Sequence, residues 1–439
     1  MTGRLLIAAP FSGTGKTTAV MALLAALARR GVTAQPFKSG PDFIDPRLHE
    51  LAMSRRSHNL DIWLLGADAV RALVARSCQD ADLGIIEGAM GLYDGLGSTD
   101  RLSAAQLARE TETPVVLLVP SRGISRSAAA LVKGFVSFWN PPVVRGIIFT
   151  RTGGPSHAEL LKKACSDCGV PALGYLPELP DCRLKDGQLG LVCPDASASR
   201  ALIGRLAEAA QECIDWPALL SVAQTARPLA EAGPAFRPSP VPLRIGLARD
   251  EAFDADYPAA LTELERAGVS WVPFSPMNDA RLPDDLNGLW IRGGGTFDPI
   301  SKVSANRSLA ADLSSRVRAG LPLWAEGLGA ACLAENARTD GQLLPLWGVL
   351  PGTVYRTDRR AGFGYVTLEM DGRTVPAHEY RYWEWEEPQA NVWAVKASNG
   401  SRWPGGFVRE GLVALFGHTH PLGASLMVED FLRTCAAFR

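Results

Sequence analysis

Residues 5–18 read LLIAAPFSGTGKTT, and this stretch decides the fold of the first half of the chain. The apolar run at its start predicts a short buried strand, and TAVMALLAALARR at 18–30 predicts a helix that stops at Gly31. Between them, a glycine-rich loop leads from the strand into the helix, where backbone N–H groups can surround a phosphate. The sequence therefore predicts an α/β domain with a P-loop that binds a nucleotide. The residues predicted to contact the nucleotide are Ser12, Gly13, Thr14, Gly15, Lys16, Thr17 and Thr18.

Two side chains of this loop carry specific chemistry. Lys16 can neutralise the charge of the β- and γ-phosphates, and the Thr17 hydroxyl can hold Mg²⁺. Pro10 stands where the GxxxxGK[ST] pattern usually has its first glycine. A tight turn without a ligand is the alternative, but Gly-Lys-Thr-Thr after a strand favours nucleotide binding.

Acidic residues near later strand ends can complete the metal site. Asp42 and Asp45 lie in the segment FKSGPDFIDP, which also contains Lys38. Glu87 ends the predicted strand LGIIE at 83–87. Because the carboxyl ends of parallel strands meet at one edge of a sheet, these side chains are predicted to face the phosphate loop. A turn or helix-cap role is the alternative for any one of these acids.

Segments further along the chain predict two α/β domains. In the first half, Leu83–Glu87, Pro114–Val119 and Gly146–Phe149 are short β-prone runs that alternate with helical stretches, which indicates a parallel sheet. Residues 216–242 contain six prolines and predict a linker. From Leu243 a second alternation begins, and its later runs YVTLEM and NVWAVKA predict antiparallel strands. The predicted domains are residues 1–215 and 243–439.

Composition excludes several classes of partner. The chain has 45 basic and 46 acidic residues and a formal net charge of −1, so no general attraction for nucleic acid or an anionic membrane is expected. No apolar run approaches the roughly 20 residues that span a bilayer, and the N-terminus leads directly into a strand, so a cytoplasmic protein is predicted. The eight cysteines form no dense framework, and no structural disulfide is expected.

Several motifs together resemble the cobyrinic or hydrogenobyrinic acid a,c-diamide synthase family of corrinoid biosynthesis. They are SGTGKTT, FKSGPDFIDPRLH, NLDIWLL, IIEGAMGLYDG, LARDEAFDADYP, FSP, GGG and the terminal GHTH. The resemblance covers nearly the whole chain. It implies a dethiobiotin synthetase-like P-loop domain with a parallel sheet, followed by an α/β domain similar to class I glutamine amidotransferases.

The resemblance also implies an activity, which is ATP-dependent amidation of carboxylate side chains on a tetrapyrrole through an acyl phosphate. ATP and Mg²⁺ are the implied cofactors. Lys16, Lys38 and Asp45 are then the expected catalytic residues, and Thr17, Asp42 and Glu87 the expected metal ligands. Tyr93, Asp94 and Ser125 are expected on the substrate side, although an ordinary turn for the first two and a helix start for Ser125 are alternatives.

One departure from the family pattern concerns the glutaminase nucleophile. The family carries a cysteine in a segment resembling AECGG, whereas residues 324–329 here read WAEGLG and place Gly327 at that position. A glycine cannot form a thioester, so glutamine hydrolysis is expected to be lost, even though His418 remains at the base position. Cys332 lies five residues further on and is expected to be a buried helix cysteine. The family's oxyanion motif, GGGYPE, appears here as Gly293-Gly294-Gly295-Thr296-Phe297-Asp298, so its last three residues differ.

The loss of the nucleophile leaves two functions open. An amidoligase would take ammonia from solution or from a separate glutaminase. The alternative is a protein that delivers a tetrapyrrole or metal, or serves as a scaffold, in an ATP-dependent manner without amidation. A homodimer is possible in either case. Thr150 stands where related proteins often read the base with asparagine, and His378 in PAHEYRYW matches a family segment only loosely, so an aromatic-rich core strand explains it equally well.

Overall fold

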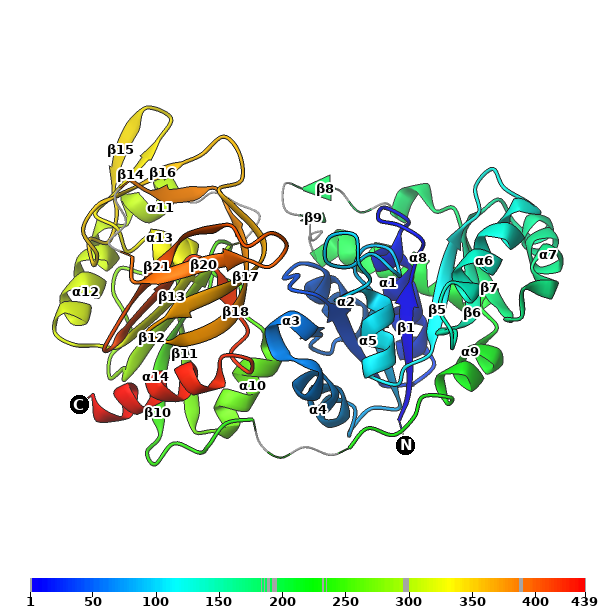
Figure 1. The fold of residues 1–439 in the computed structure, drawn as a ribbon, viewed down its shortest axis with the longest axis horizontal. Coiled ribbons are helices and arrows are strands. Elements are labelled where there is room, and N and C mark those ends of the chain that lie inside the picture. Colours follow the sequence, from blue (N-terminus) through cyan, green and yellow to red (C-terminus); the bar gives the residue numbers. More distant parts are fainter. Residues whose placement is uncertain are drawn as a thin grey trace. The chain divides into compact units, whose positions relative to one another are not determined.

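The computed structural model consists of two compact units, Met1–Ile62 with Gly66–Ala232 and Trp63–Leu65 with Gly233–Arg439. Figure 1 shows the elements of each unit. The structure describes residues 2–182, 184, 186–187, 190–191, 196–230, 233, 235–294, 300–386 and 390–438.

The first unit is built on a seven-stranded sheet in which all neighbouring strands are parallel. Its strands, in sheet order, are β3 (His58–Leu60), β2 (Ala34–Ser39), β4 (Leu83–Glu87), β1 (Gly3–Ala8), β5 (Val115–Pro120), β6 (Val144–Thr152) and β7 (Ala172–Pro177). The four strands predicted from the first half of the sequence are confirmed as β1, β4, β5 and β6. The predicted parallel α/β fold is therefore confirmed.

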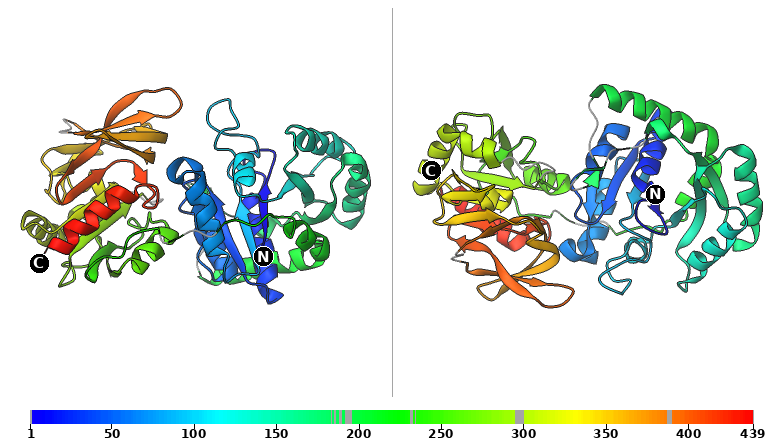
Figure 2. Two further views of the ribbon diagram at one scale, coloured as in Figure 1. Left: turned by 60° about the horizontal axis from the view of Figure 1, so that its bottom comes forward. Right: turned by 90° about the horizontal axis from the view of Figure 1, so that it is seen from above.

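Helices lie on both faces of this sheet, as the views in Figures 1 and 2 show. They are α1 (Lys16–Arg29), α2 (Asp45–Met53), α4 (Ala67–Ser77), α5 (Ala104–Glu110), α6 (Ser127–Ser137), α7 (Pro155–Ala164), α8 (Ala196–Cys213) and α9 (Trp216–Ala223). Helix α3 (Ile62–Leu65) follows β3, and its residues Trp63–Leu65 belong to the second unit. Short elements are the 3₁₀ helices η1 (Ser166–Cys168) and η2 (Pro180–Cys182) and the strands β8 (Asp186–Gly187) and β9 (Gly190–Leu191).

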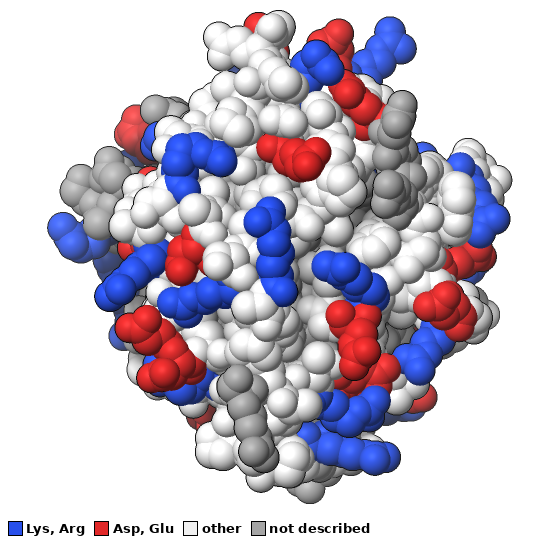
Figure 3. Space-filling view, turned by 90° about the vertical axis from the view of Figure 1, so that its left-hand side faces the viewer, with Lys and Arg blue, Asp and Glu red and all other residues white. Residues whose placement is uncertain are grey.

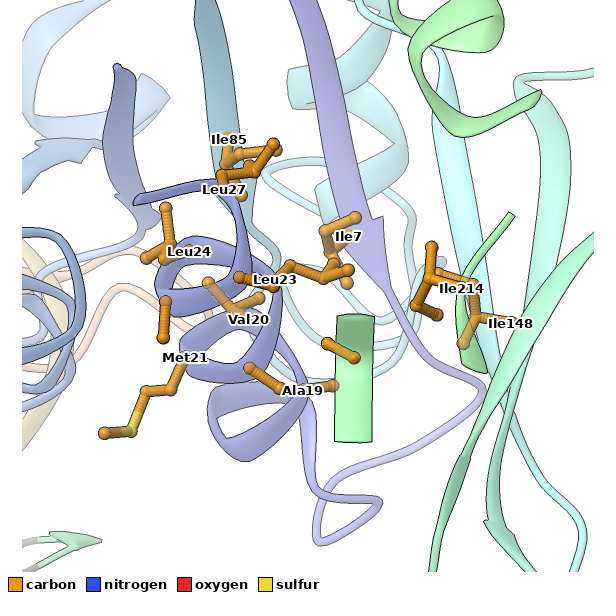
Figure 4. Packing of buried hydrophobic residues seen from close by; sticks show 14 of the residues in the cluster. Ile7, Ala19, Val20, Met21, Leu23, Leu24, Leu27, Ile85, Ile148 and Ile214 are labelled. Carbon is orange, nitrogen blue, oxygen red and sulfur yellow. The ribbon is translucent and has the colours of Figure 1, made fainter. Parts of the chain in front are cut away.

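Helix α1 forms the centre of the first hydrophobic core. Val20, Leu23 and Leu27 are fully buried and pack in one cluster with Ile7 of β1 and Ile85 of β4 (Figure 4). Because apolar residues surround α1 on nearly every side, its sequence lacks a polar face. The phosphate loop that precedes α1 is thus held between a buried strand and a buried helix.

The predicted linker 216–242 is wrong at its beginning. Asp215 caps α9 by accepting a hydrogen bond from the Ala218 N–H, and a proline occupies the second position of that helix, where its missing N–H costs nothing. Trp216 and Leu219 are buried in the core of the first unit. The first unit therefore continues through α9, and the boundary between the units, at Ala232 and Gly233, lies inside the proline-rich stretch.

The second unit contains a ten-stranded mixed sheet. Its strands, in sheet order, are β11 (Val269–Phe274), β10 (Leu243–Ala248), β12 (Gly288–Gly293), β13 (Leu323–Gly327), β22 (Leu412–Leu415), β21 (Arg402–Arg409), β20 (Val392–Lys396), β17 (Gly362–Met370), β18 (Arg373–Arg381) and β23 (His418–Thr419). The first five are parallel to their neighbours, and the pairs from β22 onward are antiparallel. YVTLEM and NVWAVKA form β17 and β20, so their predicted antiparallel pairing is confirmed.

The remaining elements of the second unit cover this sheet. They are the strands β14 (Asn336–Thr339), β15 (Gln342–Pro345), β16 (Thr353–Arg356) and β19 (Trp383–Trp385) of a four-stranded sheet, and the helices α10 (Pro258–Arg266), α11 (Ile300–Ala305), α12 (Arg307–Arg318), α13 (Leu328–Ala331) and α14 (Ser425–Ala437). In Figure 3, positive and negative side chains alternate over the visible face, in keeping with the balanced composition. Among the described helices, none is long and apolar enough to cross a membrane.

Candidate functional site

The phosphate loop has the geometry that its sequence predicts. The loop follows β1, and Lys16 and Thr17 are the first residues of α1. Gly13 and Gly15 adopt φ angles of 75° and 87°, a left-handed conformation that glycine adopts without steric cost. The Lys16 Nζ donates a hydrogen bond of 3.4 Å to the carbonyl oxygen of Phe11. The side chain of Lys16 is therefore folded back along the loop whose N–H groups can hold phosphate.

Four polar side chains meet beside this loop, and we call them the Glu87 cluster. Glu87 Oε1 accepts hydrogen bonds of 2.8 Å from both the Thr17 hydroxyl and the Lys38 Nζ. Lys38 Nζ also lies 2.5 Å from Asp45 Oδ2, and Asp45 is 3.4 Å from the Thr17 hydroxyl. Strand register explains the meeting, because β2 and β4 are neighbours and Lys38 pairs directly with Glu87. Four of the predicted catalytic and metal residues are thus brought together.

The cluster is buried, and each charge depends on the others. Burial lowers the pKa of Lys38, but the carboxylates of Glu87 and Asp45 outweigh it and raise that pKa above the usual lysine value. Burial raises the pKa of Glu87, but the Lys38 ammonium and the hydrogen bond from His49 outweigh it and hold that pKa below its usual range. Burial and the charge of Glu87 raise the pKa of Asp45 to about 6. At neutral pH the cluster holds an ion pair of Lys38 and Glu87 next to the loop.

His49 is a member of the site that the sequence analysis did not identify. It is fully buried on α2, where its Nε2 lies 2.7 Å from Glu87 Oε2 and its Nδ1 lies 3.0 Å from the Ser57 hydroxyl. The contact with the Glu87 carboxylate favours a proton on Nε2, which leaves Nδ1 to accept from Ser57. Both oxygens of Glu87 are therefore held by donors. The only sequence signal for a role of His49 in the site is its position in the segment FIDPRLH, four residues after Asp45.

We expect His49→Ala to lower the free energy of unfolding by about 3 kcal/mol, because truncation leaves a buried carboxylate oxygen without its donor. Ser57→Ala is the matched control, since it removes only the second partner of the ring and is expected to cost about 1 kcal/mol. Urea unfolding of both variants measures the difference. Equal stability of His49→Ala and the wild-type protein would contradict the assigned contact.

The remaining predicted residues have structural contacts of their own. Asp42 Oδ1 accepts hydrogen bonds from the N–H groups of Ile44 and Asp45, so it caps the start of α2. Tyr93 donates from its hydroxyl to the Phe135 carbonyl and stacks on the Phe135 ring. Asp94 is exposed and closes a turn by accepting from the Gly91 N–H at 3.0 Å. Ser125 is exposed and lies two residues before α6, where its carbonyl oxygen accepts a hydrogen bond from the Ala128 N–H.

A cavity of about 270 Å³ opens beside the phosphate loop. Thr14, Gly15 and Thr18 line it on one side, and Thr150 and Arg151 line it on another. Arg151 donates a hydrogen bond of 2.7 Å to the Gly13 carbonyl, and the buried Thr150 hydroxyl has no hydrogen-bond partner in the described part of the chain. The cavity can therefore hold the base and sugar of a nucleotide whose phosphates lie on the loop.

Gly327, the position at which the sequence analysis expects a missing nucleophile, lies on a sharp strand-to-helix turn of the second unit. Gly327 ends β13 and immediately precedes α13, with φ 60° and ψ −123°, which a side chain rarely tolerates. A Cβ atom at this position would lie 2.4 Å from the Nε2 of His418 and 2.3 Å from the Gly293 carbonyl oxygen. His418 therefore lies in the space that a cysteine would need.

Buried polar contacts hold this closed arrangement. Arg292 donates to Glu326 Oε2 at 2.7 Å, and the Thr419 hydroxyl donates to Glu326 Oε1 at 2.6 Å. His418 Nδ1 lies 3.6 Å from Glu326 Oε2. Cys332 is fully buried at the end of α13, as expected. The predicted oxyanion residues Gly295, Thr296, Phe297 and Asp298 lie outside the described residues.

Comparison with known proteins places this arrangement in a family. Residues 5–188 match the CobQ/CobB/MinD/ParA nucleotide binding domain. A cobyrinate a,c-diamide synthase of Syntrophotalea carbinolica is 37% identical over 98% of this chain and 98% of its own, and one of Caldanaerobacter subterraneus subsp. tengcongensis is 32% identical over 99% and 98%. A hydrogenobyrinate a,c-diamide synthase of Streptomyces coelicolor is 34% identical over 98% and 97%. The chain belongs to the family of cobyrinate and hydrogenobyrinate a,c-diamide synthases.

Proposed function

We propose that this protein is an ATP-dependent amidoligase that converts carboxylate side chains of a corrinoid or related tetrapyrrole into amides. The observation that carries the proposal is the buried Glu87 cluster beside a phosphate loop, in a chain that matches diamide synthases over nearly its whole length. A carboxylate resists nucleophiles because its negative charge is delocalised. Transfer of a phosphoryl group from ATP turns it into an acyl phosphate with a good leaving group.

The reaction then has two balanced steps. In the first, a carboxylate oxygen of the substrate attacks the γ-phosphorus of ATP, and ADP leaves. In the second, ammonia attacks the acyl carbon, phosphate leaves with the C–O bonding electrons, and the new nitrogen loses a proton. Lys16 would neutralise the phosphates during the first step, while Lys38 and Asp45 would position the groups that meet at the loop.

The residues beside the loop fit a magnesium ion. Thr17, Glu87 and Asp45 supply hydroxyl and carboxylate oxygens, which are the ligands that Mg²⁺ prefers, and Asp42 would contribute from the start of α2. No group of three or more His, Cys, Asp or Glu side chains in the described part of the chain is arranged to hold a metal ion by itself. When bound, Mg²⁺ neutralises charge on the β- and γ-phosphates.

The proposed source of nitrogen is free ammonia or a separate glutaminase. Gly327 offers no nucleophile, and His418 and the Gly293 carbonyl fill the space in which one would stand. A base without its nucleophile has no covalent step to assist. The second unit would therefore contribute something other than glutamine hydrolysis.

We expect ATP turnover to rise when a tetrapyrrole carboxylic acid is added, because the acid accepts the phosphoryl group. Mass spectrometry of cobyrinic acid incubated with protein, Mg-ATP and ammonium should show each amidation as a loss of about one mass unit. A protein that only delivers or holds the tetrapyrrole would show binding without this change. If no tested corrinoid or sirohydrochlorin-type acid raises turnover or changes mass, the delivery function becomes the better proposal.

A further inference from the structure

One face of the β17–β18 hairpin in the second unit is covered by aromatic side chains. Phe363 pairs directly with Tyr380, and Tyr365 pairs with His378, so these four side chains share one face of the sheet. Tyr382 lies two residues beyond Tyr380 and extends the same row. Ring centroids are 5.7 Å apart for Phe363 and Tyr380, and 6.1 Å apart for Tyr380 and Tyr382. We call these five residues the aromatic face.

The aromatic face is accessible at its outer end. Phe363 is 46% exposed, which is high for a phenylalanine in a sheet, and Tyr380 and Tyr382 are half-buried. At the inner end, His378 pairs with His418 of β23, so the face continues to the closed glutaminase position. Burial and the charge of His418 lower the pKa of His378 to about 4, which leaves its ring uncharged at neutral pH.

The opposite side of β18 holds this face rigidly. Glu379 and Arg381 alternate with the aromatic residues, are buried, and form an ion pair of 3.0 Å. Glu379 also accepts a hydrogen bond of 3.2 Å from the Trp403 Nε1. Gly362 leaves the space for this network, since a Cβ atom there would overlap the Glu379 carboxylate and lie 2.9 Å from Arg381 Nε. A surface fixed in this way loses little conformational entropy when a ligand binds.

One arginine side chain borders the outer end of the face, and two more lie in the same segment of the chain. The Arg360 guanidinium lies 4.2 Å from the centre of the Phe363 ring and 5.8 Å from that of Tyr380. Arg356 and Arg359 are exposed in the same segment, which carries three arginines against the single acid Asp358. Aromatic rings next to guanidinium groups match a flat apolar ring system with carboxylates on its rim.

We propose that the aromatic face and its arginines are a docking site for the tetrapyrrole substrate, with the macrocycle stacked on the Phe363 ring, the Tyr380 ring at 76° to it meeting the macrocycle by its edge, and the carboxylates paired with Arg359 and Arg360. This inference rests on the proposed function, because it takes the tetrapyrrole acid from there. A polycarboxylate is the expected ligand because its negative charges complement the positively charged arginines beside the aromatic face. The docking site gives the second unit a role in substrate recognition that does not depend on a cysteine at position 327.

The test uses the full chain and cobyrinic acid without ATP, with binding followed by the absorption of the macrocycle. The double variant Phe363→Ala with Arg360→Ala is expected to raise the Kd at least about 10-fold, because it removes one stacking surface and one charge. In turnover assays the same variant should raise KM for the acid and leave kcat nearly unchanged. Circular dichroism and nucleotide binding should match the wild-type protein.

A second pair in the same sheet provides the control. Arg402 lies 4.7 Å from the Trp393 ring, and Trp393 is 37% exposed. Trp393 pairs with Glu369, six residues along β17 from Phe363, which is roughly 20 Å away at the rise of a strand. Trp393→Ala with Arg402→Ala should leave the Kd within about twofold of wild type, since neither residue belongs to the proposed site.

The outcomes separate this inference from the proposed function. Unchanged Kd and KM in the Phe363 and Arg360 variant would overturn the docking site, even if the protein amidates the acid. Equal weakening by both double variants would also overturn it, as would a change in sedimentation without a change in Kd, which would indicate a contact between copies. Specific weakening in a protein that never amidates would support the docking site and refute the proposed function.

Discussion

Lys16→Ala is expected to reduce tetrapyrrole-dependent ATP turnover by at least about 10³-fold while the protein remains folded. The reduction follows from the loss of the positive charge nearest to the phosphates. The fold should survive because the buried charge of Lys16 lowers the stability of the protein when no nucleotide is bound. Burial and the nearby Lys38 ammonium lower the pKa of Lys16, which shows that the site disfavours this charge when phosphate is absent. Removing it should leave the free energy of unfolding unchanged or slightly higher.

Turnover, nucleotide binding and circular dichroism measure this expectation together. Lys162→Ala on α7 is the matched control, because that lysine is exposed and lies outside the phosphate loop. It should behave as the wild-type protein in all three assays. A folded Lys16→Ala variant with unchanged turnover would refute the assignment of the phosphate loop.

The parts of the fold that could be predicted from sequence are those whose signals are local. An apolar strand, a glycine-rich loop and an alanine-rich helix follow one another within residues 5–30, so β1, the phosphate loop and α1 were predicted correctly. The nearness of Lys38 and Glu87 could be predicted only with a further rule, which is that neighbouring parallel strands end at the same edge of a sheet. Their direct pairing between β2 and β4 confirms it.

The parts that were missed depend on tertiary contacts. His49 reaches Glu87 only because α2 packs against the strand edge, and no spacing rule connects residues 49 and 87. The prolines after residue 216 predict a linker, yet α9 forms because its proline lies in the first turn, where a helix tolerates it. Asp42 was predicted as a metal ligand, and its cap of α2 shows that one carboxylate can serve the local backbone while standing near the site.

The sequence also does not predict that neighbouring groups fill the space beside Gly327. The missing cysteine is visible in WAEGLG, but the sequence leaves His418 in place and so permits an open site. In the structure the Nε2 of His418 would lie only 2.4 Å from a Cβ atom at position 327. His418 and the Gly293 carbonyl therefore occupy the space that a side chain at position 327 would need.

For this reason, amidated product is expected to form with ammonium chloride and not with glutamine. Ammonia is mostly protonated near neutral pH, so the rate at fixed total ammonium should increase as the pH becomes mildly alkaline. Gly327→Cys should not restore glutamine hydrolysis. It should instead lower the free energy of unfolding by about 2–4 kcal/mol, because the new side chain meets His418 and the Gly293 carbonyl at a positive φ.

Glutamate release and product mass, measured with each nitrogen source at several pH values, decide the question. Gly341→Cys is a suitable control for backbone strain, since its φ is 73° and a Cβ atom there meets nothing within 4 Å. It should cost less stability than Gly327→Cys, and the difference isolates the contact with His418. Substantial glutamate release by the wild-type chain would mean that another thiol has become the nucleophile. Cys332 would be the first to test, and its complete burial is the physical reason to expect no such activity.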